Sequence, residues 1–235
     1  FRNLWKRRDK EDKWEFSAPE YPLRKKHKGP CDITEGRPFN FILLQLETFR
    51  AKDMRSFNPE LGRAPTPFLD GLAANEKSAY WTRYFANGLP TVFALMAMHT
   101  GVLPHTTKSV APSFMNTHLE GLPSFLKKHG YHTVLFSGPD PDSDNERFWF
   151  DQWYDRVVFE PSWEEKDRPL FRDAASYLKS KAGAREPFWA VVVSIANHVP
   201  FRSPEPGLDI AKGATVFERL HNTMRYTDDV VREFY

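Results

Sequence analysis

The 235-residue sequence has little of several features that would assign it to a class at once. Its one cysteine, Cys31, excludes a disulfide framework within the chain. Its longest apolar run, Ala190 to Ala196, is far shorter than the roughly 18 residues of a membrane-spanning helix. The net charge is only +2, so we expect no nucleic-acid partner. The sequence also has no internal repeat and no low-complexity tract.

What the chain does contain is 40% hydrophobic residues, which is enough for a substantial core, and 19 prolines, which indicate many loops. Short apolar runs are typical of parallel strands that are covered on both faces, and they predict neighbouring strands at Phe41–Leu46, Thr133–Phe136 and Phe188–Ile195. The remaining patterns predict a strand at 79–85 and helices from Thr66 and at 91–99, 122–129, 168–181 and 217–235. The alternation predicts an α/β fold, a mostly parallel sheet with helices on both faces.

Residues 1–38 differ from the rest of the chain in charge. Phe1 to Lys28 contains ten Lys or Arg against five Asp or Glu, with Trp5, Trp14 and Tyr21 interleaved. This composition suits a basic juxtamembrane linker, and it suits equally a solvated arm whose aromatic rings pack on the domain. We therefore divide the chain into an aromatic, basic arm, residues 1–38, and an α/β domain, residues 39–235.

Three polar groups follow predicted strands or open a predicted helix, which is where ligands bind in α/β proteins. Glu47 ends the first strand; it either holds a metal or acts as a base, or it marks the return to solvent. Thr91 opens a buried helix, whose free N–H groups suit phosphate or sulfate, and its hydroxyl is either a nucleophile or an ordinary cap. His198 follows the last strand as a metal ligand, a substrate contact or a hydrogen-bonded loop histidine.

Four stretches, in family order, resemble the sulfatase-like branch of the alkaline phosphatase superfamily, and most of all the lipoteichoic acid synthases and related phosphoglycerol transferases. They are FNFILLQLETFR, APTPFLDGLA, NGLPTVFALMAMHTGVLPH and SIANHVPF, between Phe39 and Phe201. The resemblance implies a three-layer α/β/α fold and makes residues 39–235 the N-terminal portion of a catalytic domain.

The resemblance also implies a nucleophile. In arylsulfatases the nucleophilic cysteine opens a Cys-x-Pro-Ser-Arg run nine residues before a Thr-Gly pair. Here that pair is Thr100-Gly101, and the nucleophile position is Thr91. The proline and arginine positions are Phe93 and Leu95, so formylglycine cannot form. This pattern favours the transferase branch, in which a threonine forms a phospho-enzyme.

For the cofactor, the resemblance implies one divalent ion, manganese, magnesium or zinc, because Glu47 stands where arylsulfatases carry paired aspartates. Glu47 and Thr91 are expected to hold this ion, with the carboxylate and the hydroxyl within roughly 5 Å of each other. His198 is expected to bind a phosphate or leaving-group oxygen. Arg147 and Trp149 are expected to line the head-group pocket, or else to be a surface charge and a core ring.

Two departures from the family pattern matter. The family's Asp-His pair before glycine occurs nowhere in this chain, and it would follow a segment like Arg225–Tyr235. We therefore expect a C-terminally truncated piece of a longer protein, and we interpret Asp228 and Asp229 as a solvated helix face. Pro90 also replaces the lysine that precedes the nucleophile in lipoteichoic acid synthases.

The expected activity is a metal-dependent phosphoglycerol- or phosphoethanolamine-type transferase or hydrolase that acts on a phospholipid or another phosphoester. The resemblance implies that the full-length protein is tethered to a membrane, with this domain on the extracytoplasmic face. Two alternatives stay open at this stage. One is a sulfuric ester hydrolase of the same superfamily, and the other is a catalytically inactive sulfatase-fold binding module.

Overall fold

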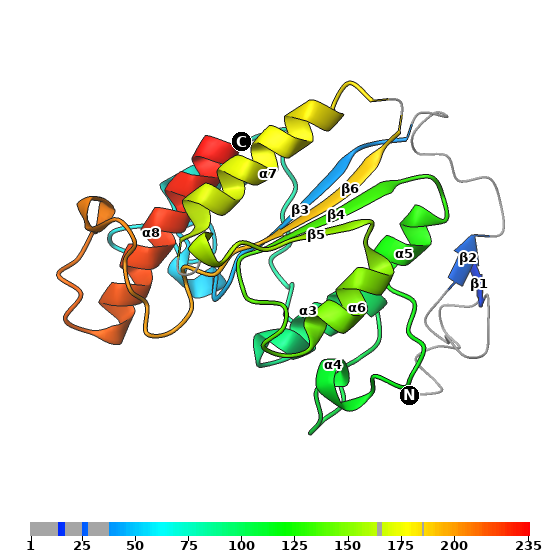
Figure 1. The fold of residues 1–235 in the computed structure, drawn as a ribbon. Coiled ribbons are helices and arrows are strands. Elements are labelled where there is room, and N and C mark those ends of the chain that lie inside the picture. Colours follow the sequence, from blue (N-terminus) through cyan, green and yellow to red (C-terminus); the bar gives the residue numbers. More distant parts are fainter. Residues whose placement is uncertain (1–13, 17–24, 28–37, 164–165, 185) are drawn as a thin grey trace. The chain divides into compact units, whose positions relative to one another are not determined.

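The computed structural model describes residues 14–16, 25–27, 38–163, 166–184 and 186–235 (Figure 1). The chain forms two compact units, residues 1–39 and 40–235. In the first unit, β1 (Trp14–Phe16) pairs antiparallel with β2 (Lys25–His27). The rest of the basic arm, on which the juxtamembrane prediction depends, lies outside the described residues.

The second unit is built on a parallel sheet. Its strands are β3 (Phe41–Gln45), β4 (His132–Ser137), β5 (Arg156–Val158) and β6 (Phe188–Val193), in the order β3-β6-β4-β5. Each pairing between neighbours is parallel. The three predicted strands are therefore confirmed as neighbours in one sheet, and β5, with only three residues, is an addition that the sequence pattern did not indicate.

Helices cover both faces of this sheet (Figure 1), which confirms the three-layer architecture. On one side lie α7 (Asp167–Lys181) and α8 (Val216–Phe234). On the other lie α3 (Thr91–Thr100), α5 (Leu122–Lys127) and α6 (Glu146–Trp153). The remaining short helices are η2 (Ala51–Asp53), α2 (Pro67–Ala73), α4 (Val110–Ser113), η3 (Pro161–Trp163) and η4 (Pro206–Leu208).

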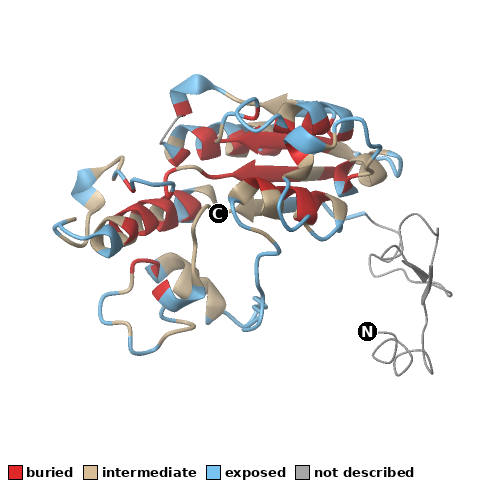
Figure 2. Ribbon diagram, turned by 90° about the horizontal axis from the view of Figure 1, so that it is seen from below, coloured by how far each residue is buried: buried red, intermediate tan, exposed pale blue. Residues whose placement is uncertain are grey.

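The core follows from the alternation of side chains along each strand. On β4, Val134 and Phe136 pack with the apolar residues of α7 and α8, whereas Leu135 packs with those of α3 and α6. Figure 2 shows the buried residues concentrated on the strands and on the helix faces against them. Gly101 ends α3 in the left-handed conformation, with φ of 70°, which glycine adopts without a steric penalty.

Two expectations for the strands are wrong. Residues 79–85 form no strand; they are an exposed segment in which Trp81 is 72% and Phe85 is 78% exposed. The segment pairs with no strand among the described residues. A high content of aromatic residues is therefore not enough to form a hydrogen-bonded β-strand here. In addition, β3 is not buried on both faces, because Ile42 is 46% exposed. Within the described sheet β3 pairs only with β6 and is an edge strand.

The interpretation of Asp228 as part of a solvated helix face is also wrong. Asp228 is fully buried, and its carboxylate accepts hydrogen bonds from the backbone N–H groups of Phe68 and Leu69, each at 2.9 Å. These are free donors in the first turn of α2. The cap expected from Thr66 is not formed, since its hydroxyl donates to Asp70 instead. A residue of α8, distant in sequence, therefore caps α2.

Replacing Asp228 with alanine should lower the free energy of unfolding by about 1–3 kcal/mol, because two buried N–H groups lose their acceptor. Urea denaturation of the full-length protein would measure the loss. Arg232→Ala on the same helix is the control; its partly exposed ion pair with Asp229 should contribute less than about 0.5 kcal/mol. Equal stabilities of the two variants would contradict the capping role.

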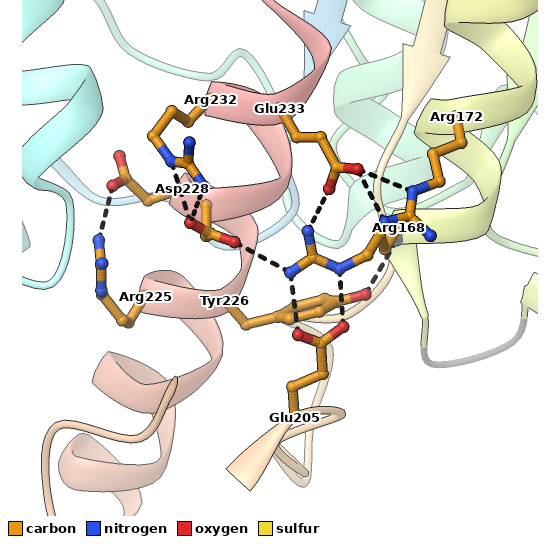
Figure 3. A network of polar contacts seen from close by, with 9 residues as sticks. Arg168, Arg172, Glu205, Arg225, Tyr226, Asp228, Arg232 and Glu233 are labelled. Atoms are coloured by element: carbon orange, nitrogen blue, oxygen red, sulfur yellow. Dashed lines mark hydrogen bonds and ion pairs between the residues drawn. The ribbon is translucent and has the colours of Figure 1, made fainter. Parts of the chain in front are cut away.

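Arg168 at the start of α7 connects α7, α8 and the loop that follows β6 (Figure 3). Its guanidinium group donates to both carboxylate oxygens of Glu205, at 2.7 and 2.9 Å, and to Asp229 at 3.0 Å. It also pairs with Glu233, and its backbone N–H donates to the hydroxyl of Tyr226 at 2.9 Å. This network holds the loop that includes His198 and Glu205 against the two helices.

Candidate active site

The carboxyl end of β3 places the first functional side chain. After β3 the chain turns sharply: Thr48 has φ of 49°, a left-handed conformation that is rare for a β-branched residue. The backbone N–H of Glu47 donates to the hydroxyl of Ser194, which follows β6, at 2.9 Å. Strained backbone of this kind is concentrated at functional sites. Here the turn directs Glu47 toward the start of α3.

Thr91 meets Glu47 at this point. Its hydroxyl donates to the two carboxylate oxygens of Glu47 at 3.1 and 3.2 Å, so the predicted closeness of the two side chains is confirmed. Pro90 occupies the cap position of α3, and Thr91 makes no capping hydrogen bond. Gly88 shapes the preceding turn, because a Cβ atom there would lie 2.6 Å from Cβ of Phe93. The hydroxyl of Thr91 therefore points at a carboxylate rather than at its own helix.

A cavity of about 490 Å³ opens over the carboxyl ends of β3, β6 and β4. Its lining includes Glu47, Thr91, His198, Arg202, Asp144 and Glu146. His198, which is exposed, lies within this lining, and one of its ring nitrogens is 2.9 Å from the carbonyl oxygen of Val199. Three of the predicted site residues thus meet at one cavity at the end of the sheet.

Comparison with protein families is decisive for the class of this domain. The sulfatase family model matches residues 39–235, which is most of the chain. The chain belongs to the sulfatase family. The expected family is thereby confirmed, and the parallel sheet with helices on both faces agrees with the fold of its structural neighbours.

Among curated relatives of this sulfatase-family chain, lipoteichoic acid synthase 1 of Bacillus subtilis is 27% identical over 83% of the chain and 33% of its own length. The lipoteichoic acid synthase LtaP from Listeria monocytogenes has a TM-score of 0.74 at 20% identity, over 85% of this chain and 52% of its own. The chain therefore spans about a third of that curated relative and about half of the LtaP chain.

Two further solved structures share the fold and contain a ligand. The C-terminal periplasmic domain of EptC from Escherichia coli, in complex with zinc, has a TM-score of 0.68 at 16% identity, over 87% of this chain and 60% of its own. The phosphoglycerol transferase GacH from Streptococcus pyogenes, in complex with sn-glycerol-1-phosphate, has a TM-score of 0.57 at 15% identity, over 83% and 56%. These likenesses concern the fold.

Of the two interpretations of Arg147 and Trp149, the structure agrees with the second, a surface charge and a core ring, and not with the pocket role. Trp149, on the buried face of α6, is 1% exposed and lies in the core. Its indole N–H donates to the carbonyl of Ala111 at 3.0 Å. Arg147 lies outside the cavity lining, and its guanidinium donates to Asp142 at 2.7 Å. The helical turn at the start of α6 directs the preceding residue, Glu146, to the cavity instead.

Sequence reasoning missed Asp167 because an acidic residue at a helix start is ordinary. Asp167 is fully buried, and its carboxylate accepts from the backbone N–H groups of Ile195, at 2.7 Å, and Ala196, at 3.2 Å. Burial raises the pKa of this carboxyl group to about 6. Asp167 thus anchors the chain just before His198 and acts as a positioning residue.

Glu146 was missed as well, although it closes the acidic loop that begins at Asp140. It is only 4% exposed, yet it lines the cavity. Burial, together with the nearby negative charge of Asp144, raises the pKa of the Glu146 carboxyl group to about 7. No sequence pattern could show this, because the burial is produced by the packing of α6 against the sheet.

The raised pKa of Glu146 predicts a pH-dependent effect on stability. The folded state holds the proton more tightly than the unfolded state, so this group's contribution to stability is lost as the pH rises from 4.5 toward 7. Relative to the parent, the Glu146→Gln variant should therefore become more stable to unfolding by about 2 kcal/mol as the pH rises from 5 to 8. Urea denaturation of both proteins at the two pH values measures the difference. If the difference in free energy of unfolding between the variant and the parent is the same at pH 5 and pH 8, the prediction is wrong.

The donor set agrees in part with the divalent ion that the family implies. The Glu47 carboxylate and the Thr91 hydroxyl converge and offer oxygen donors, which suit magnesium or manganese and are compatible with zinc. The described residues contain no cluster of three or more His, Cys, Asp or Glu that would complete such a site. The side-chain amide nitrogen and oxygen of Asn197, two residues beyond Ile195, are both buried, and neither has a hydrogen-bond partner among the described residues.

Proposed function

We propose that the protein transfers or hydrolyses a phosphoester through a covalent intermediate on Thr91. The observation that carries this proposal is the hydrogen bond from the Thr91 hydroxyl to the Glu47 carboxylate at the cavity wall. A threonine that served as a cap would direct its oxygen to the backbone N–H groups of α3, which Thr91 does not do. The N-terminus of α3 also presents N–H groups that favour a bound phosphoryl group.

In this reaction the Thr91 oxygen attacks phosphorus while the bond from phosphorus to the leaving alcohol breaks. The hydroxyl proton leaves along the hydrogen bond to Glu47, and the alcohol departs with a proton from the medium. His198, at the same cavity, donates a hydrogen bond to a phosphate or leaving-group oxygen. Attack by water or by an acceptor alcohol on the phosphothreonine then restores Thr91.

Glu47 and Thr91 would hold the divalent ion, manganese, magnesium or zinc. When bound, such an ion lowers the pKa of the hydroxyl and neutralises charge on the phosphoryl oxygens. The superfamily membership and the zinc complex of a structural neighbour support this assignment. Glu47 and Thr91 are the two ligands that we propose from the described residues.

The relatives support a phosphoglycerol-type reaction, since they include lipoteichoic acid synthases, and GacH is a phosphoglycerol transferase with a bound glycerol phosphate. By the same relationship, the proposed substrate is a phospholipid or a related phosphoester, and the proposed site of action is the extracytoplasmic face of a membrane. In the described part of the chain, no helix is both long and apolar enough to cross a bilayer. A sulfuric ester hydrolase is disfavoured, because threonine at position 91 cannot become formylglycine.

The proposal is tested by trapping the intermediate. The full-length protein is incubated with a glycerophosphodiester and manganese, quenched in acid, digested and analysed by mass spectrometry. We expect a glycerophosphoryl group on the peptide that contains Thr91, and its loss when the metal is chelated. Turnover with the group on another residue would reject Thr91. The absence of turnover on phosphoesters and sulfate esters with each of the three metals would favour the inactive binding module.

A further inference from the structure

Two helices on the same face of the sheet begin at the cavity (Figure 1). Thr91 is the first residue of α3 and Glu146 is the first residue of α6, and both line the cavity. The helices pack against each other through His99, whose ring is stacked on that of Trp153 with the centroids 5.8 Å apart. Each of these rings lies about two turns beyond the start of its helix. Thr91 and Glu146 therefore stand at about the same level.

The spacing of α3 and α6 suits a phosphoester between their first residues. The axes of packed helices lie about 8–10 Å apart. In an in-line displacement, the attacking oxygen begins about 3–3.5 Å from phosphorus. An acid that protonates the leaving oxygen lies about 2.6–3.2 Å from that oxygen, on the opposite side of the phosphorus. A nucleophile on one helix and an acid on the other are thus about as far apart as the reaction needs.

The surroundings of Glu146 leave its carboxyl group partly protonated at neutral pH. Glu146 is only 4% exposed, and the apolar side chains of Val92 and Leu95 line the same cavity. Burial, with the negative charge of Asp144, raises the pKa of Glu146 to about 7. In the described part of the chain, the other charged or titratable residues of the lining are Glu47, Asp140, His198 and Arg202. A group that titrates near the working pH can both give and accept a proton.

We propose that Glu146 is the general acid that protonates the leaving alcohol and the general base of the second step. The inference rests on the proposed function, and Glu146 takes the place of the medium as the source of that proton. As the Thr91 oxygen bonds to phosphorus, the bond to the leaving oxygen breaks, and this oxygen takes the proton of Glu146. Water or the acceptor alcohol then attacks the phosphothreonine and returns a proton to Glu146. Thr91 departs with the proton that Glu47 had accepted.

The dependence of the rate on the leaving group tests this role. The full-length protein with manganese is mixed with glycerol phosphodiesters of glycerol or of p-nitrophenol, and the first turnover on Thr91 is followed by rapid quench. A glycerol oxygen needs a proton as it departs, whereas p-nitrophenolate is stable without one. Glu146→Gln should slow adduct formation from the glycerol ester by about 10²–10⁴-fold and from the p-nitrophenyl ester by less than about threefold. The control Asp151→Asn, an exposed carboxylate on α6 outside the cavity lining, should change neither rate.

The dependence on pH separates an acid from a residue that only supports the fold. In the parent protein, adduct formation from the glycerol ester should slow as the pH rises through about 7, because Glu146 loses its proton. The same decline should be absent with the p-nitrophenyl ester and in the Glu146→Gln variant. Thermal unfolding of the variant checks that it is folded over this range of pH.

Two results would overturn the inference. One is an equal loss of rate with the two esters in a folded Glu146→Gln protein. The other is a selective loss with the glycerol ester in His198→Gln but not in Glu146→Gln, which would assign the proton to His198. In both cases the parent still forms an adduct on Thr91. A parent protein that forms no adduct on Thr91 from either ester would instead reject the proposed function, and this inference with it.

Discussion

Replacing Thr91 with alanine should reduce phosphodiester turnover by about 10³-fold or more, because the substitution removes the oxygen that attacks phosphorus. In the described part of the chain, the hydroxyl that this change removes donates only to the two oxygens of the Glu47 carboxylate. We therefore expect a loss of about 0.5–1.5 kcal/mol in stability at most. Steady-state kinetics, together with thermal unfolding of the full-length protein, separates these two effects.

Two variants make the test of Thr91 specific. Thr91→Ser keeps a hydroxyl at the same position and should retain measurable turnover. Thr100→Ala removes the same atoms from the other end of α3, where the hydroxyl donates to the carbonyl of Met96 at 2.7 Å, and it should leave activity intact. If the Thr91→Ala protein is folded and turns over substrate at the parental rate, Thr91 is not the nucleophile.

The largest effect on stability is expected from Trp149→Ala. The indole ring is 1% exposed, packs in the cluster that joins α3, α6 and the sheet, and donates to the carbonyl of Ala111. Removing a buried tryptophan leaves a cavity and typically costs about 3–5 kcal/mol. Urea denaturation should show this loss, and the milder Trp149→Phe variant allows a measurement if the alanine variant does not fold.

The matched control is Trp81→Ala, which removes the same side chain from a position that is 72% exposed. A surface substitution of this kind should change stability by less than about 0.5 kcal/mol. The pair also decides between two roles for Trp149. A Trp149→Ala protein with parental stability and a raised KM would return the ring to the head-group pocket, where the sequence interpretation first placed it.

The parts of the site that depend on local chain order were predictable from the sequence. An apolar run that stops at Glu47 already indicates the carboxyl end of a strand, and a Gly-Leu-Pro turn before Thr91 indicates the start of a helix. Because ligands of α/β proteins bind beyond the carboxyl ends of strands and at helix N-termini, a strand end and a helix start are expected to meet at such a site. The 3.1 Å contact between the Thr91 hydroxyl and Glu47 confirms that expectation.

Periodicity and short motifs were enough to predict the parallel sheet, the helix that begins at Thr91 and the family. They were not enough to predict which polar residues are buried. Glu146, Asp167 and Asp228 resemble surface carboxylates in the sequence, yet the packing of α6, α7 and α8 removes all three from solvent. Trp149, for which the sequence left a pocket position and a core position open, lies in the core as well. The physical reason is that burial depends on which neighbouring element covers a residue, and the covering residues are distant in the sequence.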